Sequence, residues 1–354
     1  MVHAGDEGDE MASVLLAEIY EQPQTIRRLI NAEAQHAAEI GPVMCQRGFN
    51  FILIAARGTS DNAARYGQYV FGAINRLPVA LAAPSLFTLY QRPPRLEGAL
   101  VIGISQSGQS PDIVGVLEEA KRQGAPSIAI TNDPDSPLAA AASHVIGLQV
   151  GQERSVAATK TYTAQLTALA LLALGLAGKM EQLSLLEEIP TVMEKALQAD
   201  KPAQLVAEKL AGSNRAIVIG RGFNYSTAHE IALKCKELAY VLAEPYSSAD
   251  FRHGPIAMVE GGFPVVLVRM GETFRQDLAL LDAKLRERGV QPVVIGDQPF
   301  SAGDMAIPVP SGLPEWLTPV AAILPGQLLA YHLAIQRGFD PDQPRLIRKI
   351  TLTQ

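Results

Sequence analysis

Short apolar runs alternate with longer amphipathic stretches through most of this sequence. Residues 12–39 carry apolar side chains at helical spacing, which predicts one or two leading helices. The apolar runs that follow are typical of buried strands: 51–56, 77–82, 99–104, 127–131 and 144–148. Between and after them, helical patterns cover 62–75, 113–123 and 161–177. Strands that alternate with helices predict a parallel sheet covered by helices.

The same order starts again after residue 205. Expected strands cover 216–220, 265–270, 293–295 and 305–309, and expected helices cover 226–242, 274–288 and 321–335, the last interrupted near Pro325. A weak echo links the halves, because Arg57-Gly58 in the first and Arg221-Gly222 in the second each end a strand and open a helix. We therefore expect two doubly wound α/β subdomains, 13–195 and 196–354, after a flexible leader at 1–12.

Composition narrows the functional classes. Of the 354 residues 48% are hydrophobic, the net charge is −6, and no basic block stands out, which argues against nucleic acid as a partner. Cys45 and Cys235 have no metal-ligand spacing, so no metal is expected, and reduced thiols fit a cytoplasmic protein. The longest apolar stretch, 166–177, is too short to span a bilayer. It predicts a buried helix, and no membrane partner is expected.

The serine-rich hexamer Ser105–Ser110 follows the run 99–104 and precedes a helix. Hydroxyl groups and backbone N–H groups at a helix N-terminus suit a phosphate, and Gly108 lets the backbone approach it closely. No lysine of the P-loop type is present, so a small phosphorylated metabolite fits better than a nucleotide. An ordinary serine-rich helix cap is the alternative interpretation.

Three further segments carry candidate catalytic residues. Glu230, Lys234 and Glu237 share one face of the expected helix 226–242, which could equally be a solvated face with a Glu–Lys pair. His253 precedes Gly-Pro, where a histidine is most often a loop residue. Lys349 is five residues before the end of the sequence, a position that usually leaves a lysine inert.

Several motifs in order resemble the sugar isomerase (SIS) fold, and specifically the isomerase half of glutamine:fructose-6-phosphate aminotransferases. They run from about residue 17 onward: Glu18–Pro23, Gly58–Ser60, Ser105–Ser110, Ser155–Lys160, Lys234–Glu244, Arg252–Pro255, Asp342–Arg345 and Lys349. We expect no N-terminal glutaminase domain, because the given sequence has no cysteine in position to open one.

The resemblance implies that the serine-rich hexamer holds a sugar phosphate. The matching residues are Ser105, Gln106, Ser107 and Ser110, with Thr59 and Ser60 completing the site. The sequence departs from the family at Ser110 (usually Thr), Gln109 (often Glu) and Arg57 (commonly Cys).

The resemblance also implies catalytic roles. Glu237 would move a proton between C1 and C2 of the open-chain sugar, with Lys234 assisting at the hydroxyls. His253 would open the sugar ring from a neighbouring subunit, which implies a homodimer, and Lys349 would form a Schiff base with the ketose carbonyl. A further sugar-contacting segment matches Glu153, Val156, Ala157 and Ala158. None of these steps requires a metal or an organic cofactor.

Without a glutaminase domain, mass action favours deamination of glucosamine 6-phosphate to fructose 6-phosphate and ammonia. We expect this reaction first. The alternatives are synthesis with free ammonia or a separate glutaminase subunit, cleavage of a 6-phosphorylated fructosamine, and action on galactosamine 6-phosphate. A non-catalytic phosphosugar sensor is the alternative from another class. Glu237→Gln would separate it from an enzyme, because a sensor needs no proton transfer.

Overall fold

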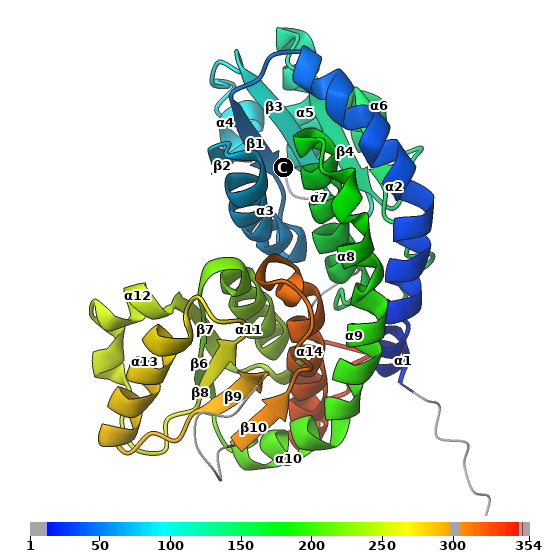
Figure 1. Cartoon of the computed structure of the whole chain (residues 1–354). Coiled ribbons are helices and arrows are strands. Elements are labelled where there is room, and N and C mark those ends of the chain that lie inside the picture. The colour runs from blue at the N-terminus through cyan, green and yellow to red at the C-terminus, as the bar shows by residue number, and fades with distance from the viewer. Residues whose placement is uncertain (1–12, 298–304, 347–348, 350–354) are drawn as a thin grey trace, which may run out of the picture.

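Two parallel five-stranded sheets organise the chain in this computed structural model, which describes residues 13–297, 305–346 and 349. Figure 1 shows them as two lobes, with helix α2 running along the flank of the first. The predicted leader, 1–12, lies outside the described residues. The prediction of two α/β units with parallel sheets is confirmed.

The first sheet has the strand order β2-β1-β3-β4-β5. Its strands are β1 (Phe51–Ala55), β2 (Val79–Leu81), β3 (Ala99–Ile104), β4 (Ser127–Thr131) and β5 (His144–Gly147). Its helices are α1 (Val14–Tyr20), α2 (Gln22–Gln46), α3 (Thr59–Asn75), α4 (Pro84–Thr88), α5 (Pro111–Gln123), α6 (Pro137–Ala141) and α7 (Lys160–Ala177). The chain reverses its winding direction between β1 and β3, and ligands of such sheets bind at the carboxyl ends of the strands beside that point.

The second sheet repeats this order as β10-β9-β8-β6-β7. Its strands are β6 (Arg215–Gly220), β7 (Leu242–Ser247), β8 (Val265–Arg269), β9 (Val293–Gly296) and β10 (Met305–Pro308). Its helices are α11 (Tyr225–Ala239), α12 (Ser248–Arg252), α13 (Arg275–Glu287) and α14 (Thr318–Gln336). Three helices connect the two sheets: α8 (Leu183–Glu187), α9 (Ile189–Ala196) and α10 (Asp200–Leu210). Single 3₁₀ turns complete the chain: Met180–Gln182, Leu197–Ala199, Gly222–Asn224, Pro255–Met258 and Glu315–Leu317.

One continuous core lies between the two sheets. In β1, Ile52 and Ile54 belong to this core, whereas Leu53 and Ala55 belong to a separate cluster under α5 and α6, as the two-residue period of a strand requires. The predicted buried helix 166–177 is confirmed as part of α7, which packs on α2. The two helix backbones meet where a Cβ atom on Gly41 would lie 2.0 Å from the carbonyl oxygen of Gly175.

Among the described helices, the segment Glu315–Gln336 is long and apolar enough to cross a membrane. It is 83% buried inside the fold and packs on α10 and α11, so it serves as a core helix. The expected interruption near Pro325 is wrong, because α14 continues through that residue.

The expected helix 226–242 is too long. Helix α11 ends at Ala239, where Tyr240 adopts a left-handed conformation with φ of 53°, and Leu242 begins strand β7. The Leu242 side chain is exposed. Strand β7 escapes the sequence pattern because it is an edge strand that holds Pro245 and has few apolar side chains.

Candidate active site

Helix α11 places Glu230, Lys234 and Glu237 together, and we call these three residues the α11 triad. The Nζ atom of Lys234 lies 2.6 Å from an Oε atom of Glu237 and 3.4 Å from an Oε atom of Glu230. Glu230 and Lys234 are buried, whereas about a quarter of the Glu237 side chain is exposed, with a side-chain accessibility of 24%. The solvated-face interpretation is therefore wrong, because the first subdomain covers this face.

Residues of α3 join the first subdomain to the α11 triad. The Thr59 hydroxyl donates to one carboxylate oxygen of Glu230 at 3.0 Å, and the Asn62 amide donates to the other at 2.7 Å. The Lys234 ammonium also donates to the Thr59 hydroxyl, at 3.3 Å. The triad thus sits at the junction of the two subdomains, beside the carboxyl end of β1.

Burial and charge act in opposite directions on the buried pair. Burial alone would lower the pKa of Lys234, but the carboxylates of Glu237 and Glu230 outweigh it, and the pKa of Lys234 is raised. Burial raises the pKa of Glu230, and Lys234 and Asn62 counter it only in part. Lys234 therefore stays an ammonium that can donate hydrogen bonds, and Glu237 is the triad carboxylate open to a bound molecule.

The serine loop, Ser105–Ser110, connects β3 to α5 at the carboxyl edge of the first sheet. The Ser105 hydroxyl oxygen accepts the N–H of Gly108 at 3.2 Å, and the Ser107 hydroxyl oxygen accepts the N–H of Gln109 at 3.3 Å. Both hydroxyl protons stay available to donate. Within the described part of the chain, the N–H groups of Ser107 and Ser110 bond to no protein acceptor. These donors suit an anion above the N-terminus of α5.

The serine loop is held against β4 and α6. Gly108 has a φ of 62°, and a Cβ atom there would lie 2.1 Å from the Ser136 hydroxyl oxygen. The carbonyl of Gln106 accepts from the Thr131 hydroxyl at 3.3 Å and from the N–H of Asn132 at 3.1 Å. Ser110 is the N-cap residue of α5, but its side chain makes no capping hydrogen bond, so the simple cap interpretation fails.

The two other predicted phosphate ligands face the subdomain junction. Thr59 bonds to the α11 triad, as described above, and the Ser60 hydroxyl accepts from the Gln165 amide of α7 at 2.8 Å. The structure thus places both at the same edge as the serine loop, with their oxygens already engaged by protein groups.

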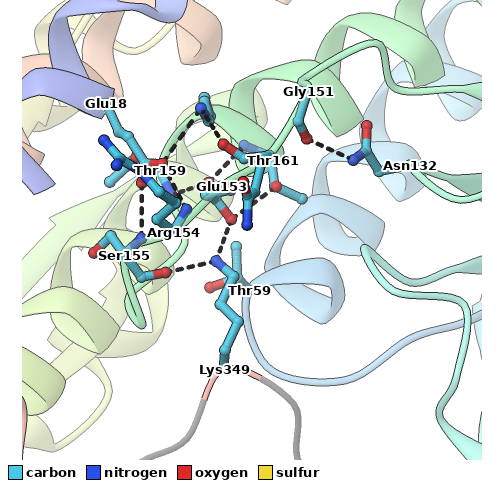
Figure 2. A network of polar contacts seen from close by, with 12 residues as sticks. Glu18, Thr59, Asn132, Gly151, Glu153, Arg154, Ser155, Thr159, Thr161 and Lys349 are labelled. Atoms are coloured by element: carbon cyan, nitrogen blue, oxygen red, sulfur yellow. Dashed lines mark hydrogen bonds and ion pairs between the residues drawn. The ribbon is translucent and has the colours of Figure 1, made fainter. Parts of the chain in front are cut away.

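Lys349 reaches the segment that connects β5 to α7 (Figure 2). Its Nζ atom lies 2.6 Å from a carboxylate oxygen of Glu153 and donates to the carbonyl of Ser155 at 2.7 Å. Burial would raise the pKa of Glu153, but Lys349 and the N–H groups of Thr159 and Thr161 outweigh it and hold that pKa low. The segment also carries Val156, Ala157 and Ala158, and its contact with a sugar stays a prediction.

Helix α1 fixes this segment from the other side. The carboxylate of Glu18 accepts the N–H groups of Arg154 at 2.6 Å and Ser155 at 3.1 Å. The buried ammonium of Lys160 lies 3.3 Å from Glu18 and 2.8 Å from Glu21. Because Glu18 holds two backbone groups next to Glu153, it positions the partner of Lys349.

His253 stands apart from these groups. It is exposed, directly after α12, which packs on α13 and β7. Among the hydrogen bonds and ion pairs of the described residues, none connects His253 to the α11 triad. Its supply to a neighbouring subunit stays a prediction.

A family model described as the SIS domain matches residues 50–175 and 209–307, which together exceed half of the chain. The chain belongs to the SIS domain family. A glutamine–fructose-6-phosphate aminotransferase (isomerizing) of Pyrococcus horikoshii is 35% identical over 345 residues, which are 95% of this chain and 57% of the relative. This SIS chain therefore spans little more than half the length of that curated relative.

Solved SIS structures share the fold. The C-terminal domain of glucosamine-fructose-6-phosphate aminotransferase from Francisella tularensis superposes with a TM-score of 0.85 and 28% identity, over 96% of this chain and all of that one. A glucosamine-6-phosphate deaminase from Thermotoga maritima has a TM-score of 0.76 at 23% identity, over 96% of this chain and all of that one, which shows the fold alone.

Sequence reasoning missed how strongly the site depends on Glu230 and Glu18. Glu230 was seen only as part of a helix face, and its contacts with Thr59 and Asn62 arise between residues about 170 positions apart, with separations of 171 and 168. For Glu18 the available signal was an acidic residue within the otherwise apolar helix α1. Across the described ranges no group of three or more histidine, cysteine or acidic side chains could hold a metal ion.

Proposed function

We propose that this SIS protein is a sugar-phosphate isomerase that deaminates glucosamine 6-phosphate to fructose 6-phosphate and ammonia. The observation that carries the proposal is the junction itself. The serine loop with its anion donors lies at the carboxyl edge of the first sheet, and Thr59 at the same edge bonds to Glu230 and Lys234 of the α11 triad, next to the Glu237 carboxylate. The similarity to aminotransferase isomerase domains supports the sugar class.

The serine loop would bind the 6-phosphate and leave the C1 and C2 atoms near the α11 triad. Glu237 removes the C2 proton of the open-chain aldose and returns it at C1, which leaves an imine at C2. Water adds to this imine, ammonia leaves, and a ketone remains. General acid–base groups of this kind contribute about 10²- to 10⁴-fold to rate. The raised pKa of Lys234 keeps it charged, so it can stabilise negative charge on the enolamine oxygen.

Lys349 would condense with the C2 carbonyl of the ketose product and release water, and hydrolysis of this Schiff base would free fructose 6-phosphate. An amine must lose a proton before it attacks a carbonyl, and the Glu153 carboxylate is 2.6 Å away to accept it. His253 would open the sugar ring across a homodimer interface.

The test is ammonia release from glucosamine 6-phosphate by the purified protein, with galactosamine 6-phosphate as a second substrate. Glu237→Gln should lower kcat by about 10²- to 10⁴-fold and leave sugar-phosphate binding unchanged. Glu208→Gln, the same change on the exposed surface of α10, is the matched control and should keep full activity.

No ammonia from either substrate would overturn the deaminase. Interconversion of glucose 6-phosphate and fructose 6-phosphate would then retain the isomerase class alone.

The second candidate is synthesis of the amino sugar with ammonia from a separate glutaminase. The similarity to a relative described as a glutamine–fructose-6-phosphate aminotransferase, over 57% of the length of that relative, favours it. Fructose 6-phosphate with ammonium salt tests it directly. Formation of glucosamine 6-phosphate without measurable release in the other direction would support this candidate over the first.

A further inference from the structure

Arg57 places a cation beside the serine loop, where the rest of the loop offers only neutral donors. Its Nε atom lies 2.7 Å from a carboxylate oxygen of Asp112, which is two residues after the loop in the first turn of α5. The guanidinium therefore lies at the N-terminus of α5, where the loop donors converge.

The contact with Asp112 uses one edge of the guanidinium only. About half of the Arg57 side chain is exposed, with a side-chain accessibility of 51%, whereas that of Asp112 is 2%. Within the described chain neither terminal nitrogen of Arg57 bonds to a protein group, and the buried Oδ1 atom of Asp112 has no hydrogen-bond partner. The pair thus fixes the side chain through Nε and leaves both terminal nitrogens, each with two N–H groups, without a protein acceptor among the described residues.

The charges at the carboxyl edge of the first sheet explain why the free N–H groups of Arg57 matter for binding an anion. Asp61 and Arg65 form one ion pair at the start of α3, and Arg57 and Asp112 form the second. Without Arg57, the buried Asp112 carboxylate would repel a phosphate at the start of α5. With it, two parallel N–H groups match the geometry of a phosphate, which makes charge-assisted bonds stronger than those of neutral donors.

We propose that Arg57 is a phosphate-binding residue, which donates its terminal N–H groups to the 6-phosphate held by the serine loop while Asp112 fixes it in place. This inference rests on the proposed function for the identity of the sugar. The binding of an anion at the loop does not depend on it.

The second subdomain shows why a test must separate binding from structure. Arg221, at the corresponding turn, pairs with Asp277 of α13 at 3.0 Å. There the Phe274 ring occupies the loop position, 5.0 Å from the Arg221 guanidinium. An ion pair of this type thus also exists where no serine loop is present, and an effect of Arg57 could come from pairing alone.

The experiment measures binding of fructose 6-phosphate and of inorganic phosphate by calorimetry. Arg57→Gln should weaken both by about 10- to 100-fold, the loss expected for charge-assisted hydrogen bonds. The affinities of Arg57→Lys should lie between those of the wild-type protein and Arg57→Gln, because lysine keeps the charge and loses the paired donors. Arg221→Gln, the matched control in the second subdomain, should leave both affinities unchanged.

A second background distinguishes direct contact from neutralisation of Asp112. In Asp112→Asn protein, the further change Arg57→Gln should still weaken phosphate binding about tenfold or more. An equal affinity with and without Arg57 in that background would overturn the proposal, since Arg57 would then only offset the carboxylate.

Failure of the proposed function gives a different pattern. Wild-type protein that binds inorganic phosphate through Arg57 but ignores both fructose 6-phosphate and glucosamine 6-phosphate would retain the anion contact and refute the sugar assignment. Wild-type protein that binds none of the three would refute both. Thermal unfolding of each variant checks that it is folded. If Arg57→Gln does not fold, the comparison of Arg57→Lys with the wild-type protein is the test.

Discussion

The carboxyl edges of the two sheets share an Arg-Gly turn and an arginine–aspartate ion pair but differ in the loop beside them. In both, an Arg-Gly turn opens a helix, with φ of 54° at Gly58 and 60° at Gly222. The arginine of each turn pairs with an aspartate of a later helix, Arg57 with Asp112 of α5 and Arg221 with Asp277 of α13. In the first sheet the loop beside this pair is serine-rich. In the second, Phe274 packs so close that a Cβ atom on Gly222 would lie 2.5 Å from its ring.

The two aspartates also differ in the partners that their carboxylates bind. Among the described residues the Asp112 carboxylate bonds to Arg57 alone, whereas that of Asp277 binds Arg221, Ser248 and Arg252, the last two from α12. Asp277 therefore anchors the helix that precedes His253. Under the proposed function, one framework would hold a ligand in the first half, whereas in the second half it holds the protein's own segment.

Loss of the cation at the junction should have the largest effect on stability. Lys234→Met leaves the buried Glu230 without its charged partner, which should cost about 3–5 kcal/mol in the free energy of unfolding. Denaturant unfolding measures it. The double change Glu230→Leu with Lys234→Met should recover most of the loss, and an equal loss in both would show that packing of the lysine stem, not charge, is what matters.

Alanine at the paired glycines tests whether only one edge binds a ligand. Gly108→Ala strains a positive φ and crowds Ser136, so it should reduce sugar-phosphate affinity by about 100-fold. Gly222→Ala strains the other edge and should lower stability by about 1–3 kcal/mol with unchanged affinity. Equal losses of affinity in the two variants would contradict the idea that only the first sheet binds the sugar phosphate.

Asparagine at the paired aspartates tests anchoring. Asp277→Asn should destabilise the protein by about 2 kcal/mol, and Asp112→Asn by less than half of that, because Asp277 has more partners. Chemical denaturation compares them. If α12 positions a ring-opening histidine, Asp277→Asn should also lower kcat more than it raises KM, and unchanged kcat would argue against that role for α12.

A pH profile gives the smallest effect and reports on α11, the helix that spans the junction. Burial, with smaller contributions from Arg65 and Lys236, lowers the pKa of His229 to about 4. Above pH 6.5 the histidine is neutral in both states, and between pH 6.5 and 4 only the unfolded chain binds the proton. Stability should therefore fall across this window as pH falls, by about 1–2 kcal/mol after allowance for partial exposure.

His229→Gln should flatten this part of the profile. A slope that stays the same in the variant would assign it to other groups.

The sequence pattern predicted nine of the ten strands in the described residues, because each has a short apolar run, and the clearest runs are the fully buried β3 and β8. It missed β7, which lies at the sheet edge, and the helices α8–α10, which connect the subdomains. The serine loop and the α11 face were visible as local patterns. The ion pairs of Arg57 and Arg221 were not, because each joins residues more than fifty positions apart, with separations of 55 and 56.

The carboxylate of Asp342 accepts the N–H groups of Val14 and Leu15 at 2.9 and 2.7 Å, and so completes the first turn of helix α1. These partners are 328 and 327 positions apart. Helix α1 leaves the ribosome among the first residues described here but receives this cap only after α14 has been synthesised. Since Glu18 of α1 holds the segment that meets Lys349, this segment receives its full support only after Asp342 has been synthesised. Until then the N-terminus of α1 depends on the Ser13 side chain, which accepts the N–H of Leu16.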